Sequence, residues 1–464
     1  MNNLSDDIWY YVLMNITKIN AIEIMDSRGK PTIRTFITLE DSSVHSSSVP
    51  SGASTGAHEA VELRDGDQSR HLGQGVLKAV ANVNDIIAPK IIGLKVSDPK
   101  KIDSIMIELD GTENKSKLGA NAILSVSMAV TRAAAYMAEQ PLWQFINEYY
   151  FSNQQSTADN QQPSFPRLMV NIVNGGNHAG WNFDIQEFMI MPVSTKPTKS
   201  IRIAAEIFQQ LGAELKSQKL STLVGDEGGY SPALSSNEEV FGIIEKAANK
   251  CEYNRGRDFD FAVDCAANEF YSEGGYHLRK LPEIILNSFQ DLSNSDDKML
   301  KQVQHDTKKY ELTSTQLMEY YFELEQKYSI SSFEDPFAED DWDTFAKFTR
   351  ELTTDNQQPT TVVGDDIFVT NPKRIKRGIE EKSANAVLIK LNQIGTVTET
   401  IEAIRMTQNA GWKVAISHRS GETEDTFIAD LAYGVAADFI KTGSMSRAER
   451  LAKYNRLIEI ENGM

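Results

Sequence analysis

From residue 168 onward the chain alternates short apolar runs with stretches of helical periodicity, and this alternation restricts its fold more than any other feature. The apolar runs predict strands near 168–174, 185–191, 260–265, 329–334, 361–364, 385–391, 413–417 and 438–441. The periodic stretches predict helices near 200–217, 236–250, 314–327, 341–351, 372–380, 397–410, 425–434 and 446–460. Eight strands separated by helices are typical of an α/β chain that folds as a (β/α)8 barrel, so we expect a barrel over residues 167–464.

The part of the chain before the barrel has a different pattern. Residues 17–42 alternate as strands do, with a hairpin turn at Asp26 to Gly29, and helical periods follow at 75–91 and 119–139. We therefore expect an α+β domain over residues 17–150. The other expected divisions are an N-terminal extension over 1–16 that lacks the basic region of a signal peptide, a polar linker over 151–166 and an aperiodic surface insertion near 281–311.

Composition narrows the range of partners. The 464 residues carry a net charge of −18, which argues against nonspecific binding to nucleic acid or to an anionic membrane. No apolar stretch reaches the length of a membrane span. Cys251 and Cys265 are the only cysteines, too few for a disulfide framework, and this favours a cytoplasmic protein in a reducing environment.

Acidic side chains follow three consecutive predicted barrel strands: Asp264, Glu334 and Asp365. The functional groups of barrels lie at the carboxyl ends of the strands, so we expect these carboxylates to meet at one mouth. Each of them alone is equally consistent with a helix N-cap or a turn. Together they predict a site for a hard cation, with Mg²⁺ favoured.

Basic and hydrogen-bonding side chains follow the later strands. Lys390 lies in an apolar run, where burial without a partner would favour its neutral, basic form. Another run ends at Ser417 and is followed by His418, Arg419 and Ser420, whose donors suit a phosphate group. A buried base and an anion cradle predict proton abstraction from an anionic substrate.

Four further residues can be interpreted either as functional or as ordinary structural residues. Glu227 lies in a glycine-rich loop that alone would be an ordinary turn, and Glu187 lies in an apolar strand where burial would raise its pKa for general acid work, unless it is a salt-bridged structural residue. His178 and Lys441 are single polar residues of the kind that is usually structural or solvated. The small-residue loop at 52–56 is expected to be a lid whose serine hydroxyl can reach a metal.

Several uninterrupted runs occur in a fixed order along the chain: Asp26 to Gly29, Ser51 to Gly56, Glu62 to Asp67, Lys117 to Leu124, Gln186 to Met189, Gly225 to Gly229, Glu334 to Trp342, Lys390 to Thr396 and Ser417 to Asp430. With these runs the chain resembles the enolase family, the phosphopyruvate hydratases of glycolysis, from about Ile22 to Glu461. The resemblance implies an enolase-type barrel with an N-terminal α+β capping domain. It also implies reversible, Mg²⁺-dependent dehydration of 2-phosphoglycerate to phosphoenolpyruvate in glycolysis and gluconeogenesis.

The resemblance also implies a role for each matching residue. Lys390 would remove the C2 proton, and Glu227, with Glu187 beside it, would protonate the departing C3 hydroxyl. Two Mg²⁺ ions would stabilise the ene-diolate intermediate, an arrangement that general accounts of enolase-superfamily chemistry already describe. The implied metal ligands are Asp264, Glu334 and Asp365 for the first ion and Ser54 for the second; the implied substrate-binding residues are His178, Gln186, Glu187, Ser417, Arg419, Ser420 and Lys441, and His418 is implied to be catalytic.

The family's dimer contact usually pairs an acid in the second strand with an arginine in the last helix. The matching positions here are Arg34 and Glu459, with the charges exchanged, which implies a homodimer with a swapped ion pair. An alternative class is a non-catalytic adhesion or scaffold protein on the same fold, which should have lost the base, the acid or a metal ligand; none is lost here. A superfamily acid-sugar dehydratase would not share the run from Ser417 to Asp425.

Overall fold

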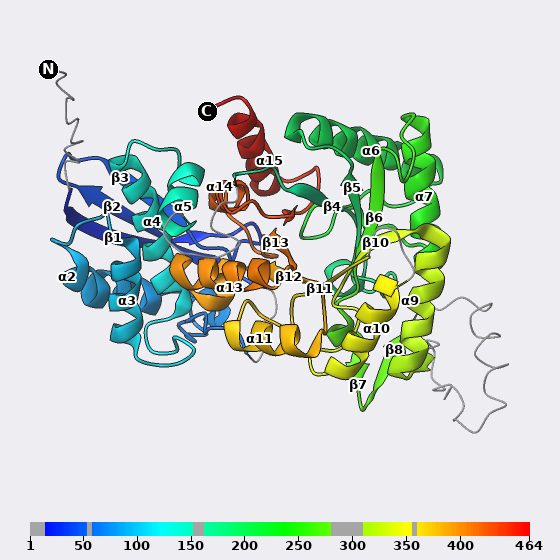
Figure 1. Cartoon of the computed structure of the whole chain (residues 1–464), viewed down its shortest axis with the longest axis horizontal. Coiled ribbons are helices and arrows are strands. Elements are labelled where there is room, and N and C mark those ends of the chain that lie inside the picture. Colours follow the sequence, from blue (N-terminus) through cyan, green and yellow to red (C-terminus); the bar gives the residue numbers. More distant parts are fainter. Residues whose placement is uncertain (1–13, 53–57, 152–161, 280–309, 355–359) are drawn as a thin grey trace, which may run out of the picture.

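The computed structural model describes residues 14–52, 58–151, 162–279, 310–354 and 360–464, and it divides into two units that lie side by side (Figure 1). The first, N-terminal unit combines three strands with a group of helices. Its strands are β1 (Ile16–Met25), β2 (Pro31–Leu39) and β3 (Val44–Ser48); its helices are η1 (His71–Gly73), α1 (Leu77–Ala81), η2 (Asn82–Ile87), α2 (Ala88–Ile91), α3 (Pro99–Asp110), α4 (Ala120–Met137) and α5 (Leu142–Phe151).

The N-terminal sheet is antiparallel, in the order β1-β2-β3, and α4 packs against β2 and β3. Nearly every side chain of α4 is buried, because its many small residues let the helix approach the sheet closely. The hydroxyls of Thr35 and Ser125 lie 2.7 Å apart across this contact. The predicted α+β pattern is present, but β3, α3 and α5 are additional to the predicted elements. Four of the five residues of β3 are polar, so it lacks an apolar alternation.

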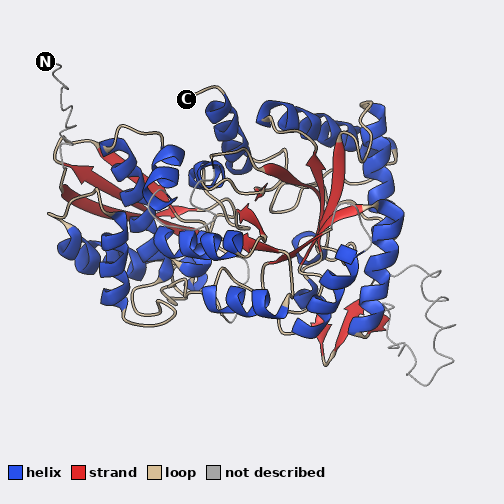
Figure 2. Ribbon diagram, viewed as in Figure 1, coloured by secondary structure: helices blue, strands red, loops and turns tan. Residues whose placement is uncertain are grey.

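Eight strands close the barrel of the second unit, in the order β10-β11-β12-β13-β14-β4-β5-β6, and helices surround them (Figure 2). The strands are β4 (Arg167–Asn174), β5 (Glu187–Pro192), β6 (Phe259–Asp264), β10 (Ile330–Glu334), β11 (Thr361–Gly364), β12 (Ala386–Ile389), β13 (Lys413–Ser417) and β14 (Phe439–Lys441). The helices are η3 (Gly176–Ala179), α6 (Pro197–Ser217), α7 (Asn237–Lys250), η4 (Ala267–Phe270), α9 (Ser314–Tyr328), α10 (Trp342–Thr354), α11 (Pro372–Glu381), α12 (Leu391–Ile394), α13 (Val397–Asn409), α14 (Phe427–Gly434) and α15 (Ala448–Glu461). The predicted barrel is confirmed, and each predicted strand and helix has a counterpart.

The expectation that helices separate all of the barrel strands is wrong at its start. β4 and β5 are antiparallel, as are β5 and β6, whereas the other neighbours are parallel. Only the short η3 lies between β4 and β5, and both α6 and α7 follow β5. The connection 175–186 contains only η3 and no longer helix that could form a crossover, and the chain reverses direction. Because of this reversal, β5 begins at the mouth where the parallel strands end.

A third, small sheet lies beside the barrel and contains β7 (Tyr271–Ser272), β8 (Gly275–Leu278) and β9 (Tyr310–Leu312). The insertion predicted near 281–311 lies mostly outside the described residues, and its last two residues belong to β9 rather than to an aperiodic segment. Within the described ranges, no helix has both the length and the apolar character that a bilayer crossing requires.

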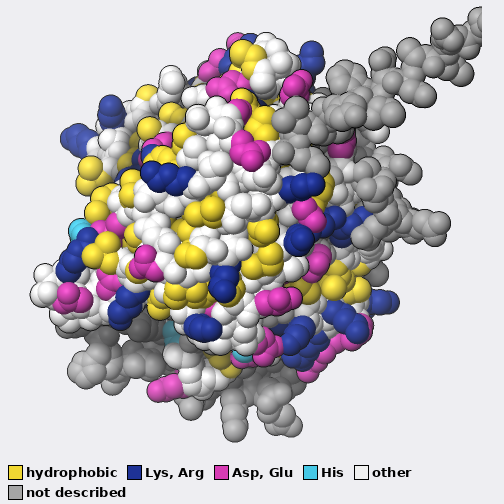
Figure 3. Space-filling model, turned by 90° about the vertical axis from the view of Figure 1, so that its left-hand side faces the viewer, with side chains coloured by type: hydrophobic (Ala, Val, Ile, Leu, Met, Phe, Trp, Pro, Cys, Tyr) yellow, Lys and Arg dark blue, Asp and Glu magenta, His cyan; other side chains and the backbone are white. Residues whose placement is uncertain are grey.

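The outer face of the N-terminal unit has a mixed surface. Apolar side chains are scattered there among charges of both signs (Figure 3). The large apolar residues of this unit that are exposed are Ile22, Met25, Val44, Leu72, Leu77, Ile86, Ile92 and Tyr136. No field of one sign covers the described part of this face.

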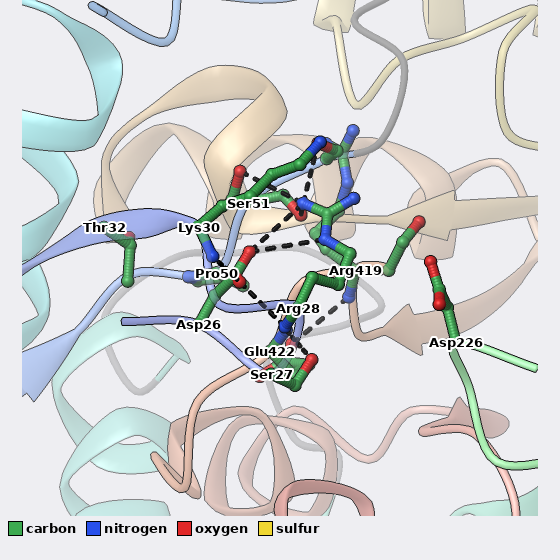
Figure 4. Close-up of polar contacts among 12 residues, drawn as sticks. Asp26, Ser27, Arg28, Lys30, Thr32, Pro50, Ser51, Asp226, Arg419 and Glu422 are labelled. Carbon is green, nitrogen blue, oxygen red and sulfur yellow. Dashed lines mark hydrogen bonds and ion pairs between the residues drawn. The ribbon is translucent and has the colours of Figure 1, made fainter. Parts of the chain in front are cut away.

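The hairpin turn between β1 and β2 is bonded to the loop after β13, so the two units are joined close to the barrel mouth (Figure 4). The backbone N–H of Arg28 donates to Asp26 Oδ1 (2.8 Å), and the Arg28 guanidinium donates to the carbonyl of Ser51 (3.0 Å). Ser51 and Gly421 exchange two backbone hydrogen bonds of 2.8 and 2.9 Å. A Cβ atom on Gly421 would lie 2.1 Å from Asp26 Oδ2, so only glycine fits there. The turn therefore fixes the loop that carries Arg419.

Candidate active site

The predicted site residues gather at one mouth of the barrel. In the strand register Glu187 lies opposite Asp264, Asp264 lies opposite Glu334, and Ser417 lies opposite Lys441. One cavity at this mouth is lined by Glu59, Asn177, His178, Gln186, Glu187, Glu227, Asp264, Ala266, Glu269, Asp335, Asp365, Asp366, Lys390, Ser417, His418, Arg419, Ser420 and Lys441. Every predicted site residue that the structure describes lies in this lining, apart from Glu334, which contacts it through Lys441. Ser54 lies outside the described residues.

Lys441 is the cation at the centre of the acidic cluster. Its Nζ lies 2.8 Å from Asp264 Oδ2, 2.8 Å from Glu334 Oε1 and 3.2 Å from Glu187 Oε1. The expectation that a lysine at a strand end is solvated is wrong here, because the side chain is buried. Although burial acts in the opposite direction, the surrounding carboxylates hold the pKa of Lys441 well above its usual value. The carboxylates therefore favour the ammonium form of Lys441.

Lys390 lies immediately after β12, and its ammonium contacts Asp365 Oδ2. The prediction of a buried lysine without a partner is therefore wrong in this structure. Burial lowers the pKa of Lys390, but Asp365 and the other nearby carboxylates outweigh it, and the net pKa is raised. The second oxygen of Asp365 accepts a hydrogen bond from Gln393 Nε2 (3.2 Å). For Lys390 to act as a base, its ion pair with Asp365 would first have to weaken.

Asp335 shapes the mouth, although it was not among the predicted site residues. Its two carboxylate oxygens accept the backbone N–H groups of Asp365 (2.9 Å) and Asp366 (2.7 Å), and so fix the loop after β11. Burial and the neighbouring carboxylates raise the pKa of Asp335 well above its usual value and that of Asp366 to about 7. The run of acids after β10 and β11 was the available signal, since it contains these two residues.

Glu187 and Glu227 form a carboxyl pair close to Lys441. Burial and the charge of Glu227 raise the pKa of Glu187 well above its usual value, as predicted. Burial raises the pKa of Glu227, but the basic side chains around it, Lys441 and Arg450 included, lower that pKa well below the usual value. Glu227 Oε1 lies 3.6 Å from His418 Nε2 and 3.8 Å from His178 Nδ1. The two pKa values are shifted in opposite directions, so a proton on this pair is favoured on Glu187.

Arg419 is held by a residue that the sequence reasoning missed. Its guanidinium lies 3.1 Å from Glu59 Oε2 and donates to Asn392 Oδ1 (2.8 Å). All three side chains are buried. Glu59 comes from the N-terminal unit, in the stretch after the small-residue loop, and nothing in its local sequence distinguishes it from an ordinary surface glutamate. The N-terminal unit therefore helps to hold the Arg419 guanidinium in place at the mouth.

The donor chemistry of the mouth fits a hard cation. Eight carboxylates line the cavity, against two lysines and one arginine. Glu187 Oε2 and Glu334 Oε2 are buried without a hydrogen-bond partner, which is costly unless a cation or a proton joins them. Oxygen ligands of this kind suit Mg²⁺.

The predicted ligand trio is not drawn together in this structure, because Lys441 and Lys390 stand among its carboxylates. The groups of potential ligands that lie within 4.8 Å of one another among the described residues are His178, Glu187 and Glu227, and Asp335, Asp365 and Asp366. Asp365 thus belongs to one compact acidic group, while Asp264 and Glu334 are bridged by the Lys441 ammonium.

A barrel mouth with two ion-paired lysines, a carboxyl pair whose pKa values are shifted in opposite directions and a fixed guanidinium is typical of an enzyme that carries out acid–base chemistry on an anion. Comparison with known proteins agrees. Residues 16–146 match the family model for the enolase N-terminal domain, and residues 162–464 match the model for the enolase C-terminal TIM barrel domain.

Two curated relatives are similar over almost their whole lengths. The chain is 49% identical over 452 residues to the enolase of Desulfotalea psychrophila, covering 96% of each protein. It is 48% identical over 450 residues to enolase 1 of Methylococcus capsulatus, covering 97% of each. The chain belongs to the enolase family. Its enzyme class is accordingly hydro-lyase, of the phosphopyruvate hydratase type.

Proposed function

We propose that the protein catalyses the reversible dehydration of 2-phosphoglycerate to phosphoenolpyruvate, with Mg²⁺, as a cytoplasmic enzyme of glycolysis and gluconeogenesis. One observation carries the proposal: a single cavity joins Lys390, the Glu187–Glu227 pair and Arg419. In the proposal these residues serve as a base, an acid and an anion anchor. An elimination of water next to a carboxylate needs all three.

In this proposal Asp264, Glu334 and Asp365 would hold one Mg²⁺, and Ser54 would join a second. When bound, the two ions supply positive charge that stabilises the ene-diolate more than the substrate. The unpaired Glu334 Oε2 and the excess of carboxylates in the lining support a metal here.

Lys390 takes the C2 proton, which requires its neutral amine. Asp365 holds Lys390 as an ammonium in the structure, so the basicity of Lys390 depends on what else Asp365 binds. Lys441 stays charged among its carboxylates and binds the substrate carboxylate. The two lysines thus have different roles: Lys390 exchanges a proton, and Lys441 stays positively charged.

Glu227 delivers the proton to the departing C3 hydroxyl, and Glu187 is the reservoir from which Glu227 receives it. The raised pKa of Glu187 and the lowered pKa of Glu227 support this division. His418 and His178 flank Glu227 on its Oε1 side. The phosphate is bound by Arg419 and Ser420, and the remaining substrate contacts come from Gln186 and Ser417.

The test is the absorbance of phosphoenolpyruvate during incubation with 2-phosphoglycerate, with and without Mg²⁺. Wild type should form product only with Mg²⁺, and Lys390→Ala should form it at least about 10²-fold more slowly. Lys376→Ala is a matched control, because this lysine is exposed and lies 3.9 Å from Glu380 on α11. No product from folded wild type with Mg²⁺ would sink the proposal and favour the non-catalytic scaffold.

We further propose a homodimer in which Arg34 of one protomer meets Glu459 of its partner. Within the chain Arg34 bonds Glu424 (2.6 Å) and Glu459 bonds Arg456 (3.0 Å), so both charges lie where they can exchange partners. Ile22, which pairs in register with Arg34, is exposed. Arg34→Glu should raise the monomer fraction in analytical ultracentrifugation, and adding Glu459→Arg should restore the dimer. A dimer unaffected by Arg34→Glu would argue against this pair.

A further inference from the structure

Arg450 on α15 is a fully buried arginine next to the acid side of the mouth. Its Nη1 lies 2.7 Å from His418 Nδ1 and donates to the carbonyl of Arg419 (2.6 Å). Its Nη2 donates to the carbonyls of Ser420 (2.6 Å) and Asp226 (3.2 Å). One guanidinium therefore joins the loop after β13 to the loop that carries Glu227.

The contact with His418 restricts where the imidazole proton can be. A guanidinium has only donors and stays protonated, so the nitrogen that faces it must accept. His418 Nδ1 is therefore unprotonated, and the doubly protonated imidazolium is excluded while the contact lasts. The single ring proton must lie on Nε2, which is the nitrogen 3.6 Å from Glu227 Oε1.

We propose that Arg450 is a positioning residue that fixes His418 as the neutral Nε2–H tautomer, so that the imidazole presents an N–H donor, and not a lone pair, to Glu227. His418 Nε2 is buried and makes no hydrogen bond to the described residues, and the acidic atom next to it is Glu227 Oε1. The importance of this donor for the reaction rests on the proposed function; the tautomer itself does not.

The consequence is a division of roles around Glu227. Asn171 Nδ2 donates to Glu227 Oε2 (3.1 Å), and His418 presents its donor to Oε1. With a donor on each side, the ionised form of Glu227 is stabilised once it has given up its proton. In the reverse reaction the same donors keep Glu227 ready to take a proton from water.

Gly443 leaves room for the Arg450 side chain beside Glu227. It has φ +78°, and a Cβ there would lie 2.8 Å from Arg450 Cδ and 2.8 Å from the carbonyl oxygen of Glu227. Only glycine combines that backbone conformation with the passage of the arginine stem. Gly443→Ala should therefore displace the Arg450 guanidinium without removing its charge.

The direct test is the ¹⁵N spectrum of the full-length protein labelled at histidine, recorded by magic-angle-spinning NMR. The chain has seven histidines, and the His418 signals are those lost in His418→Gln. Wild type should show an unprotonated Nδ1 and a protonated Nε2. A protonated Nδ1, or an imidazolium, would overturn the proposal whether or not the enzyme is active.

The second measurement separates Arg450 from general packing. Arg450→Met should change the His418 tautomer and lower kcat by about 10-fold to 100-fold, the scale of a misplaced proton-transfer group, with a smaller change in KM. Arg456→Met is the matched control: it removes an arginine of the same helix that pairs with Asp430 (2.9 Å) and should leave the tautomer unchanged. A wild-type tautomer in folded Arg450→Met would show that Arg450 does not fix it.

If Arg450→Met does not fold, Gly443→Ala takes its place with the same readout. A changed tautomer in Gly443→Ala supports the proposal, and an unchanged one contradicts it. Wild type that lacks activity with the expected tautomer would sink the proposed function and leave this inference standing, so the two failures are distinguishable.

Discussion

The interior of the barrel and its mouth are built by the same strands but have opposite chemistry. A cluster of buried apolar side chains, separate from the main core, takes residues from seven of the eight strands: Met169, Met189, Met191, Ala262, Val363, Ala386, Leu388, Ala415 and Phe439. The mouth directly beyond them is lined by eight carboxylates, two lysines and one arginine.

The two regions are related by a step of two residues. Because alternate side chains of a strand point to the same face, the residue two places beyond an inward apolar one also points inward. The pairs are Met169 with Asn171, Ala262 with Asp264, Val363 with Asp365, Leu388 with Lys390, Ala415 with Ser417 and Phe439 with Lys441; in the reversed β5, Glu187 precedes Met189 by the same step. The functional residues are thus the last layer of the barrel filling, and only their side chains differ from the layer below.

The comparison predicts opposite effects for Lys390 in the mouth and for Leu388, the apolar residue two positions before it. Lys390→Met should lower kcat by roughly 10²-fold to 10⁴-fold, the usual scale for a proton-transfer group, while the protein still folds. The measurement is initial rate together with circular dichroism. Rates within a few-fold of wild type would show that Lys390 is not the base.

Leu388→Ala should have the reverse signature. Leu388 is fully buried, and truncation should lower the free energy of unfolding by about 2–5 kcal/mol through lost burial and a cavity. The activity of each folded molecule should change little. Urea unfolding followed by fluorescence measures the first quantity, and rates normalised to folded protein measure the second. Lost activity in folded Leu388→Ala would mean that the layers are not independent.

The layering explains what could be predicted from the sequence. Apolar runs that end in Asp264, Glu334 and Asp365 are local patterns, so both the strands and the polar residues after them were predictable. The reversal at β5 was not predicted, since pairing direction depends on contacts that strand periodicity does not encode. For the same reason the sequence indicated Glu187 as a buried acid but not that it begins its strand.

Other features of the site depend on contacts between distant segments. Glu59 and Arg419 are 360 positions apart, and Arg450 meets His418 from the last helix. Neither contact has a periodic or local signature. The ion pair of Lys390 with Asp365 was missed for a related reason: burial is visible in a sequence, but the partner of a buried charge is not.

Asp103 is a buried carboxylate that belongs neither to the barrel interior nor to its mouth. It accepts hydrogen bonds from the backbone N–H (3.1 Å) and the hydroxyl (2.6 Å) of Thr398 where the N-terminal unit meets α13, and burial raises its pKa to about 6. The folded pKa is therefore above the unfolded value near 4. Asp103 contributes stability below pH 4 that is lost as the pH rises through about 6, to the extent of about 3 kcal/mol.

Asp103→Asn should remove this pH dependence. The difference in unfolding free energy between wild type and the variant should fall as the pH rises from 4 to 7, measured by urea titration at each pH. A difference that is constant with pH would show that folding does not raise the pKa of Asp103.

Metal binding sharpens the contrast between mouth and interior. A ligand that binds only the folded state stabilises it by about 2.7 kcal/mol at 100 times its Kd, so Mg²⁺ should raise the free energy of unfolding of wild type by about that amount. Glu334→Gln should lose most of this increment, because it removes a proposed ligand charge. Glu269→Gln, at a residue that lines the cavity but is not a proposed ligand, should keep it, and Leu388→Ala should keep it on a lower baseline. Each comparison is made on the same variant with and without Mg²⁺, so the effect of the substitution itself cancels.

An equal increment in Glu334→Gln and Glu269→Gln would place the metal elsewhere in the mouth, with the Asp335, Asp365 and Asp366 group as the next site to test.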